Sequence, residues 1–208
     1  MKIKICGMKY PNNIKVIQIY EPDFIGFIFY KNSPRYVIDT TLSAAVNLNK
    51  NIKKVGVFVN NPIEEVIKIV NEYELNYVQL HGDESVDYAK KLFAENINII
   101  KAFRINDYFD WNDLNIYIPF VSYFLFDTAT ENYGGSGLKF NWEQLKNYKG
   151  ETPFFLSGGI SIADIQEIKK LNIPQLYALD INSKFEKEPG LKDATLINKM
   201  INKVRNEE

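Results

Sequence analysis

Hydrophobic residues in this chain gather into short runs that alternate with longer amphipathic segments. Eight of the runs have the length and the β-branched or aromatic content of strands. They are Lys2–Cys6, Phe24–Phe29, Val55–Val59, Tyr77–Leu80, Ile99–Phe103, Tyr123–Asp127, Pro153–Ser157 and Leu176–Asp180. Several, such as FIGFIF, VGVFV and YFLF, are almost continuously apolar, which is typical of parallel strands covered on both faces.

The segments between these runs show the three-to-four-residue apolar spacing of helices. The clearest is Pro62–Leu75, which has a proline in its first turn followed by acidic residues. The segments Glu84–Asn96, Ile160–Asn172 and Asp193–Asn206 follow the same pattern. The segment Asn106–Pro119 is less regular and predicts a short helix with a loop.

Eight strands alternating with eight helical segments fit either a (β/α)₈ barrel or an open doubly wound sheet. The open sheet is disfavoured because the chain reads CGMKYP after its first strand, without the GxGxxG of a dinucleotide fold. No linker-like, low-complexity or highly charged stretch divides the chain. We therefore predict an α/β fold, a single-domain (β/α)₈ TIM barrel over residues 1–208, with short loops because this length is near the lower limit for a barrel.

Composition and charge narrow the class of partner. A net charge of −1 gives no global basic field for nucleic acid or anionic membrane. The single cysteine cannot form an internal disulfide, which favours a reducing compartment. The first residues lack the apolar core of a signal peptide, and the apolar stretch Ile116–Phe126 is too short to span a bilayer. We expect a soluble cytoplasmic protein without nucleic-acid or membrane partners.

The candidate chemistry lies where the predicted strands end, which is where a barrel of this kind builds its active site. Polar, titratable and glycine residues crowd these positions. They are Cys6-Gly7, Ser33-Pro34-Arg35, Asn60-Asn61, His81-Gly82, Arg104, Asp127, Ser157-Gly158-Gly159 and Asp180. The sequence therefore predicts one functional rim.

Two of these residues can carry proton-transfer chemistry. Cys6 is either a small buried hydrophobe or a base or nucleophile whose pKa a positive neighbour or a helix N-terminus lowers. Asp127 ends the most apolar strand and is a candidate general acid, a helix cap or a loop anchor. The loop after it contains GGSG at residues 134–137, which predicts a mobile flap over the site or simply a long loop.

Other rim residues suit the binding of anions. Gly158 and Gly159 open a helix after the seventh strand, where backbone N–H groups bind phosphate in many barrels or form a tight turn. The eighth strand ends in Asp180 and is followed by Asn182 and Ser183, close to the same place.

Arg35 and His81 complete the set of candidates. An arginine at this rim can hold a carboxylate through two hydrogen bonds, although most arginines are solvated surface residues. His81 is the only histidine in the chain. It is a candidate for positioning more than for proton transfer.

Seven motifs in order make the chain resemble one known family. They are KICGMK, GFIFYKNSPRYV, VGVFVNNP, VQLHGDES, LFDTATENYGGSGLKFNW, FLSGGI and LDINSKFEKEPGLKD. From Lys4 to Asp193 the chain resembles the phosphoribosylanthranilate isomerases of tryptophan biosynthesis. The resemblance implies a small (β/α)₈ barrel that needs no metal or organic cofactor. It implies an Amadori rearrangement of N-(5-phosphoribosyl)anthranilate to 1-(2-carboxyphenylamino)-1-deoxyribulose 5-phosphate.

The resemblance also implies a role for each candidate. Cys6 would be the general base that removes the proton from ribose C2, and Asp127 the general acid that opens the furanose ring. Arg35 would hold the anthranilate carboxylate. The substrate-binding set would also include His81, and the phosphate would lie on Gly158, Gly159, Asp180, Asn182 and Ser183.

The chain departs from the family pattern after its eighth strand. Where the family commonly has a DVSSGVE run, this chain has DINSKFE, so Asn182 replaces a serine and Lys184 replaces a glycine. Lys139 also stands one position later than a lysine common in the family, and we assign it no role. The phosphate ligands are therefore the part of the site that the resemblance fixes least.

Several other interpretations stay open at this point. Another phosphosugar barrel of the same pathway, indole-glycerol-phosphate synthase, would need catalytic lysines at strand ends, and the tryptophan synthase α subunit is a second such barrel. A broader alternative is a relaxed isomerase that also acts on the related histidine-pathway aminoaldose. That reaction commonly pairs two aspartates, so Cys6 favours the tryptophan-pathway substrate. A non-catalytic phosphosugar-binding barrel would lose the proton-transfer pair. Monomer and homodimer are both compatible with the sequence.

Overall fold

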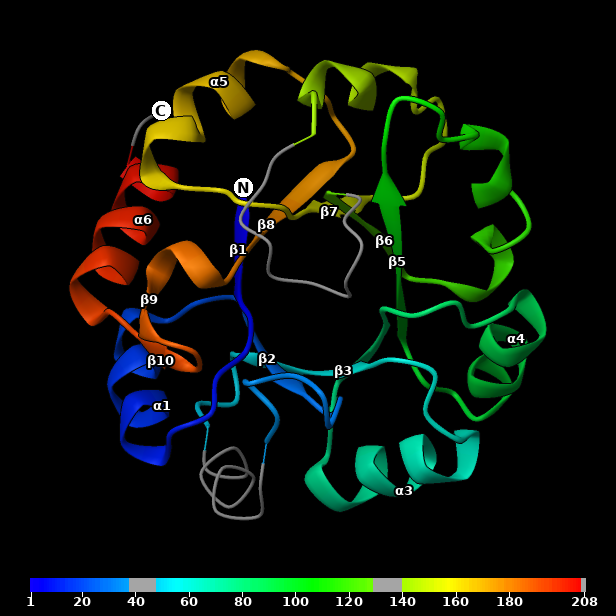
Figure 1. Ribbon diagram of the computed structural model, residues 1–208, viewed down its shortest axis with the longest axis horizontal. Coiled ribbons are helices and arrows are strands. Elements are labelled where there is room, and N and C mark those ends of the chain that lie inside the picture. The colour runs from blue at the N-terminus through cyan, green and yellow to red at the C-terminus, as the bar shows by residue number, and fades with distance from the viewer. Residues whose placement is uncertain (38–47, 129–139, 207–208) are drawn as a thin grey trace.

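The computed structural model describes residues 1–37, 48–128 and 140–206, and its strands form a closed barrel (Figure 1). The eight barrel strands are parallel and follow chain order: β1 (Lys2–Ile5), β2 (Phe24–Ile28), β3 (Lys53–Phe58), β4 (Tyr77–Leu80), β5 (Ile99–Ile105), β6 (Tyr123–Thr128), β7 (Phe154–Leu156) and β8 (Leu176–Ile181). β1 pairs with both β2 and β8, which closes the barrel. The predicted barrel is confirmed, and both ends of each predicted strand lie within two residues of the ends of an observed strand.

The helices surround the barrel on the outside (Figure 1). The α-helices are α1 (Pro11–Ile17), α3 (Ile63–Tyr73), α4 (Val86–Ala94), α5 (Ile165–Lys170) and α6 (Ala194–Asn206). Short 3-10 turns supplement them: η1 (Gln18–Tyr20), η2 (Trp111–Leu114), η3 (Ile118–Phe120), η4 (Trp142–Asn147), η5 (Ile162–Asp164) and η6 (Ser183–Phe185). Within the described residues, the connections on either side of β6 carry only 3-10 turns. A small antiparallel hairpin after β8, β9 (Glu186–Glu188) with β10 (Leu191–Lys192), was not predicted.

Local sequence signals explain where the two clearest helices begin and end. α3 follows Pro62 and has Glu64 and Glu65 in its first turn, which suits the positive end of the helix dipole. It ends at Glu74, whose φ of 50° is left-handed. α4 starts after Ser85, whose hydroxyl accepts a hydrogen bond from the Tyr88 N–H at 3.3 Å.

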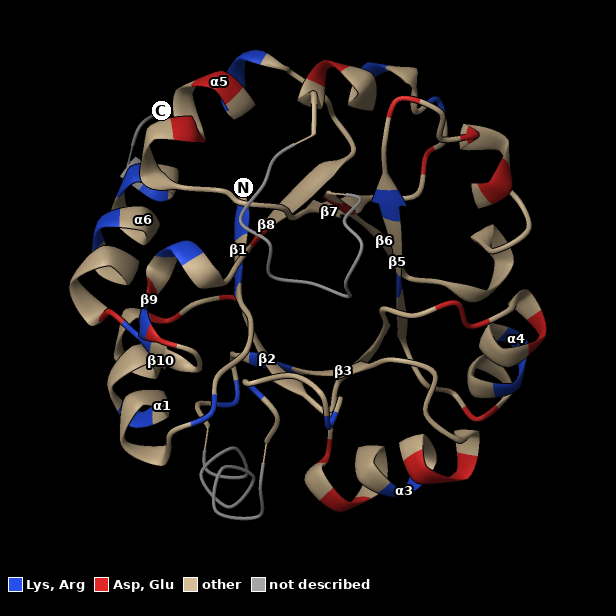
Figure 2. Cartoon of the chain, viewed as in Figure 1, with Lys and Arg blue, Asp and Glu red and all other residues tan. Residues whose placement is uncertain are grey.

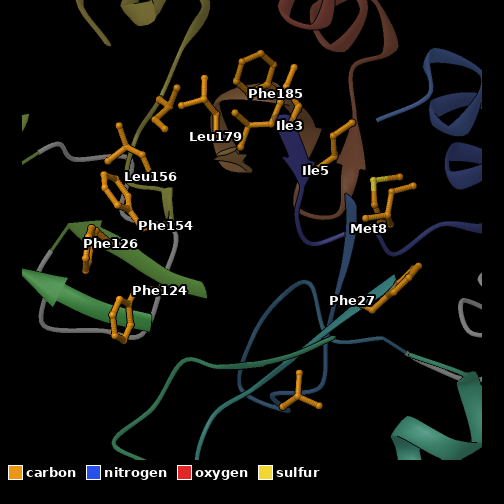
Figure 3. Packing of buried hydrophobic residues seen from close by; sticks show 14 of the residues in the cluster. Ile3, Ile5, Met8, Phe27, Phe124, Phe126, Phe154, Leu156, Leu179 and Phe185 are labelled. Carbon is orange, nitrogen blue, oxygen red and sulfur yellow. The ribbon is translucent and has the colours of Figure 1, made fainter. Parts of the chain in front are cut away.

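The main hydrophobic core lies between the barrel and its helices. Alternate strand residues point outward into it, and Figure 3 shows Ile3, Ile5, Phe27, Phe124, Phe126, Phe154 and Leu179 among its members. The rings of Phe126 and Phe154 lie with their centres 4.7 Å apart. This packing fixes which face of each strand is turned toward the barrel interior.

A second, smaller cluster fills the interior of the barrel near the amino ends of the strands. It consists of Phe24, Val55, Ile100, Ala102, Leu125, Phe155 and Ala178, with Tyr77, Tyr123 and Tyr177 packed against it. We call its five ring-bearing members Phe24, Tyr77, Tyr123, Phe155 and Tyr177 the aromatic layer. The ring of Phe24 meets that of Phe155 edge to face at 5.1 Å, and Tyr123 stacks on Tyr177 at 4.8 Å. One end of the barrel is therefore closed by close-packed rings.

Most charged residues lie on the helices and connecting segments outside the barrel (Figure 2). A small set of polar residues is nevertheless buried: Lys4, Lys54, Gln79, Glu84, Lys101, Asp127, Asp164, Asp180 and Lys192. None of the helices among the described residues is long and apolar enough to cross a membrane. The GGSG stretch and Lys139 fall outside the described residues.

Candidate active site

Cys6 lies directly after β1 and is almost wholly buried. Its N–H donates to the Ile181 carbonyl at 2.9 Å, which ties the start of the first loop to the end of β8. Gly26 lies opposite on β2, and a Cβ added there would come within 2.9 Å of the Cys6 sulfur. The glycine therefore leaves the space that the thiol occupies.

Burial raises the pKa of Cys6 above its ordinary value, and the nearby charges of Lys4 and Lys192 act in the opposite direction. Positive neighbours, which the sequence alone could not show, are present, but their effect on the pKa of Cys6 does not outweigh desolvation. The thiolate is therefore a stronger base than an exposed one, at the cost of a smaller ionised fraction near neutral pH.

The Lys4 ammonium sits inside the barrel and has no exposed surface. It donates to Asp180 Oδ1 at 2.9 Å and to Gln79 Oε1 at 2.7 Å. Burial alone would lower the pKa of Lys4, but the charges of Asp180 and Cys6 raise it overall. Burial raises the pKa of Asp180, although Lys4 opposes the shift. This is an ion pair completed by a third hydrogen-bonding partner, which buried charges require.

Asp127 occupies the inward face of β6 near its carboxyl end, where it is buried. Its Oδ1 accepts from the Thr128 N–H at 2.8 Å. Its Oδ2 lies 3.5 Å from Nε2 of His81, which follows β4. Nδ1 of His81 lies 2.7 Å from Gln79 Nε2. We call Lys4, Gln79, His81, Asp127 and Asp180 the polar layer; like Cys6, they lie toward the carboxyl ends of the strands.

Arg35 reaches the same rim but already has a carboxylate partner. Its Nε donates to both Glu186 oxygens at 3.0 and 3.1 Å, and its Nη2 donates to Oε2 at 2.7 Å. Burial opposes the ionisation of Glu186, but Arg35 and Lys192 hold the pKa of that carboxyl below its ordinary value. The Nη1 edge of the guanidinium takes no part in this ion pair. An arginine has five donors in a fixed plane, so this edge can receive a second carboxylate.

Lys192 on β10 joins this group to Asn182. Its Nζ donates to Asn182 Oδ1 at 2.6 Å and to Glu186 Oε1 at 2.7 Å. Burial lowers the pKa of Lys192 to about 8, with Glu186 opposing the shift. Gly7 has a φ of 73°, and a Cβ there would come within 2.7 Å of Arg35 Cδ and 2.9 Å of Asn182 Oδ1. The loops after β1, β2 and β8 therefore meet closely beside Cys6.

The glycine turn after β7 borders Asp127. Gly158 and Gly159 have φ values of 96° and 62°, a left-handed conformation that glycine adopts without steric cost. A Cβ at Gly158 would come within 3.1 Å of Asp127 Oδ1. Successive N–H groups in such a turn form a concave anion site. Ser161 and Asp164 then cap η5, with Ser161 N–H donating to Asp164 Oδ2 at 2.7 Å.

The three residues predicted at the end of the eighth strand, Asp180, Asn182 and Ser183, have separate surroundings in the structure. The Asp180 side chain points into the barrel to Lys4, and the Asn182 amide is held by Lys192. Ser183 begins η6, and the next residue, Lys184, is exposed on it. In the structure, Asp180 thus belongs with the polar layer, while Asn182 and Ser183 form the start of the turn.

Sequence reasoning missed Lys4, Gln79, Glu186 and Lys192. A signal for two of them is the two-residue period of strands, which places Lys4 on the same face as Cys6 and Gln79 on the same face as His81. Once one residue of such a pair is a candidate, its partner two positions away is one as well. Glu186 and Lys192 gave no such signal, because both belong to the hairpin that was not predicted.

The arrangement suits acid–base chemistry on a small anion. Cys6 directly after β1 and Asp127 on β6 are separated around the barrel by β7 and β8. A ligand lying across the barrel mouth can therefore contact a thiol on one side and a carboxyl on the other. Arg35 and the glycine turn provide cationic and N–H groups at the same rim.

Comparison with known proteins identifies relatives over almost the whole chain. Residues 3–203 match the family model described as N-(5'phosphoribosyl)anthranilate (PRA) isomerase. The N-(5'-phosphoribosyl)anthranilate isomerase of Parabacteroides distasonis is 43% identical over 206 residues, which cover 98% of this chain and 93% of the relative.

Solved structures agree with the sequence match. The phosphoribosyl anthranilate isomerase of Thermotoga maritima superimposes with a TM-score of 0.88 at 31% identity, covering 99% of both chains. A phosphoribosyl anthranilate isomerase in complex with reduced 1-(o-carboxyphenylamino)-1-deoxyribulose 5-phosphate gives a TM-score of 0.85 at 28% identity, again over 99% of both chains.

Proposed function

The chain belongs to the N-(5'-phosphoribosyl)anthranilate isomerase family, and from that premise we propose that Cys6 and Asp127 are the base and the acid of its reaction. The reaction is the isomerisation of an aldose to a ketose in tryptophan biosynthesis, and it is the activity of this chain. Such a rearrangement needs one proton delivered to the sugar ring oxygen and one proton removed from C2.

Asp127 supplies the first proton. Its protonated carboxyl gives the proton to the furanose oxygen, the C1–O bond breaks, and the substrate nitrogen forms a protonated Schiff base with C1. Asp127 is left as a carboxylate. The Thr128 N–H at 2.8 Å and His81 Nε2 at 3.5 Å surround its two oxygens. Groups that are already in place stabilise the developing negative charge without reorganisation.

Cys6 removes the second proton. Its thiolate takes the proton from C2, and the electron pair moves through C1 to the Schiff-base nitrogen, which gives an enolamine. The C2 hydroxyl then loses its proton and C1 gains one, which yields the ketose. Lys4 and Lys192 favour the thiolate, while burial makes it more basic.

The binding residues hold the two ends of the substrate. The Nη1 edge of Arg35 receives the anthranilate carboxylate while Glu186 keeps the guanidinium in place. The N–H groups of Gly158 and Gly159 receive the phosphate, with the Asn182–Ser183 turn beside them. We assign Asp180 to the reacting centre rather than to the phosphate, because its carboxylate is buried against Lys4 and would repel an anion.

The observation that carries this proposal is the position of Cys6 and Asp127, both buried, on different strands at one rim of a closed barrel. The test follows the fluorescence of phosphoribosylanthranilate after addition of the purified chain. We expect loss of fluorescence with the wild type. Cys6→Ala and Asp127→Asn should each lower turnover by about 100- to 10,000-fold, with a much smaller change in KM.

The outcomes separate this proposal from its alternative. If both variants keep near-normal turnover, the assigned roles are wrong. If the wild type binds the phosphorylated product but leaves the fluorescence unchanged, the chain is a phosphosugar-binding barrel without the reaction, or it takes another aminoaldose.

We infer that the chain works in the cytoplasm on this small phosphosugar, as a monomer or a homodimer. The single buried cysteine supports a reducing compartment. Light scattering on the purified chain distinguishes the two oligomeric states.

A further inference from the structure

The polar layer contains a row of three hydrogen bonds and one longer polar contact that the acid and base roles leave unexplained. Lys4 Nζ donates to Asp180 Oδ1 at 2.9 Å and to Gln79 Oε1 at 2.7 Å. Gln79 Nε2 lies 2.7 Å from His81 Nδ1. Nε2 of the same imidazole lies 3.5 Å from Asp127 Oδ2. The row therefore runs from β8 through β1 and β4 to β6, across the inside of the barrel.

The direction of each bond follows from its donor. An ammonium can only donate, so the oxygen of the Gln79 amide must face Lys4. The nitrogen of that amide can only donate as well, so Nδ1 of His81 must accept. The ring proton of the neutral imidazole is therefore on Nε2, the nitrogen that faces Asp127.

We propose that Gln79 is a positioning residue for the general acid, because it holds His81 as the Nε2–H tautomer, in which the protonated nitrogen is the one nearer to Asp127. The inference rests on the role proposed for Asp127 and adds two residues, Gln79 and Lys4, that act on it through the imidazole. Neither of them needs to touch the substrate.

The tautomer matters for the acid in two ways. Because Nε2 already carries a proton, it cannot take the proton of the Asp127 carboxyl before the sugar ring does. Once that proton has moved to the ring oxygen, the Nε2–H group donates toward the new carboxylate and stabilises it. The opposite tautomer would direct a lone pair of His81 at Asp127, so it would either take the proton or repel the charge.

Burial makes the orientation of Gln79 firm. Lys4 and Gln79 are 0% and 1% exposed, so water does not compete for these bonds. Turning the amide by half a rotation would place its NH₂ group against the Lys4 ammonium and its oxygen against Nδ1. The amide NH₂ group and the ammonium, both donors, would then face each other without an acceptor between them, which is costly in a low dielectric. Asp180 balances the Lys4 charge, so the anchor is itself satisfied.

The direct test needs no substrate. His81 is the only histidine in the chain, so isotope-labelled histidine gives one imidazole in a proton–nitrogen correlation NMR spectrum. We expect the pattern of the Nε2–H tautomer in the wild type near neutral pH. A spectrum of the Nδ1–H tautomer, or of an equal mixture, would overturn the proposal.

Two variants of the same residue complete the test. In Gln79→Glu the carboxylate still accepts from Lys4 but now also accepts from Nδ1–H, so the imidazole must either reverse its tautomer or take a second proton. Turnover should fall by about 10- to 100-fold with KM nearly unchanged, and the pH profile should shift. Gln79→Met, of similar length and without hydrogen bonds, should give a mixed tautomer and a smaller loss.

The outcomes also separate this inference from the proposed function. If Gln79→Glu folds and keeps the wild-type imidazole spectrum and turnover, Gln79 is not a positioning residue. A loss of turnover in both variants with an unchanged spectrum would assign Gln79 a packing role and equally overturn the proposal. If Asp127→Asn keeps its turnover, the proposed acid is wrong, although the wild-type spectrum then still reports the tautomer.

Discussion

The two ends of the barrel interior are built on opposite principles. The side chains of the aromatic layer pack against one another in edge-to-face and stacked ring contacts. Burial, together with hydrogen bonds to Tyr177 and Tyr77, raises the pKa of Tyr123, so its phenol stays neutral. The polar layer lies in the same tube. Its residues Lys4, Gln79, Asp127 and Asp180 are buried like Phe24 and Phe155, yet the layer holds an ammonium and two carboxyl groups. Burial is therefore not what distinguishes a core from a site here; charge is.

The two layers contribute to the free energy of folding in opposite directions. Burying rings in the aromatic layer stabilises the fold through area and contact geometry. Burying Lys4 and Asp180 costs desolvation, which their mutual attraction only partly offsets. We therefore expect substitutions in the aromatic layer to change stability alone, and substitutions in the polar layer to change activity, with stability lost only where a charge is left unpaired.

The largest expected effect on stability comes from breaking one buried pair. Lys4→Met leaves the Asp180 carboxyl buried without its partner and should lower the free energy of unfolding by about 3–5 kcal/mol. Denaturant titration measures this loss. The double variant Lys4→Met with Asp180→Asn should recover a large part of it, because no unpaired charge remains. Two losses that simply add would contradict this view of the polar layer.

A substitution in the aromatic layer should give the reverse result. Phe155→Leu removes ring contacts with Phe24, Tyr123 and Tyr177 but keeps most of the volume. The free energy of unfolding should fall by about 1–2 kcal/mol. Turnover should stay at the wild-type level, because no group of the polar layer moves. A clear loss of turnover in the folded variant would show that the two layers are coupled.

A methyl group added at Gly26 tests how closely the side chains of Cys6 and Lys4 are packed beside β2. In Gly26→Ala the new Cβ would lie 2.9 Å from the Cys6 sulfur and 3.2 Å from Lys4 Cε. The thiol must shift, so turnover should fall by about tenfold, which is about 1.4 kcal/mol in the barrier. Gly56→Ala is the matched control, since its Cβ meets Leu75 and Phe58 in the outer core instead. Equal turnover in the two variants would refute the steric argument.

The smallest expected effect is a dependence of stability on acid. The pKa of Glu186 is depressed in the folded state, so its contribution is present above the ordinary pKa of 4.5 and is lost as pH falls through the lower folded value. The difference in melting temperature between the wild type and Glu186→Gln should therefore shrink as the solution is acidified below that pH. A difference that stays constant would mean that the pairing with Arg35 and Lys192 contributes nothing.

Much of the fold could be predicted from the sequence because the strands are nearly continuous apolar runs. β4 was predicted with its observed bounds, Tyr77–Leu80, and the other strands within two residues. The hairpin of β9 and β10 could not be predicted. Its first strand is the short polar run EKE, whose strand conformation depends on tertiary contacts such as that of Arg35 with Glu186. The connection before β6 was predicted only as a short helix with a loop, because its 3-10 turns leave little periodicity in the sequence.

In the candidate site, too, the positions of residues could be predicted from the sequence, whereas their contacts could not. The positions of Cys6, Asp127 and Gly158 at one rim followed from reading strand ends, and the structure places them there. The partner of each charge could not be read in this way. Lys4 on β1 meets Asp180 on β8, and Arg35 in the loop after β2 meets Glu186 in the hairpin after β8. Such pairings depend on strand order and on burial, and one sequence contains neither directly.

The register of the closing strands links the site to the order of folding. Lys4 and Asp180 are cross-strand partners where β1 meets β8, and the Cys6 N–H bonds to the Ile181 carbonyl. These contacts join the two ends of the chain and close its longest loop, so we expect them to form late if the chain condenses from local βα units. A refolding molecule can bury its outer core before its ends meet, but Cys6 gains the nearby charge of Lys192, and Lys4 gains Asp180, only when they do. The recovery of activity during refolding should therefore report when β1 pairs with β8.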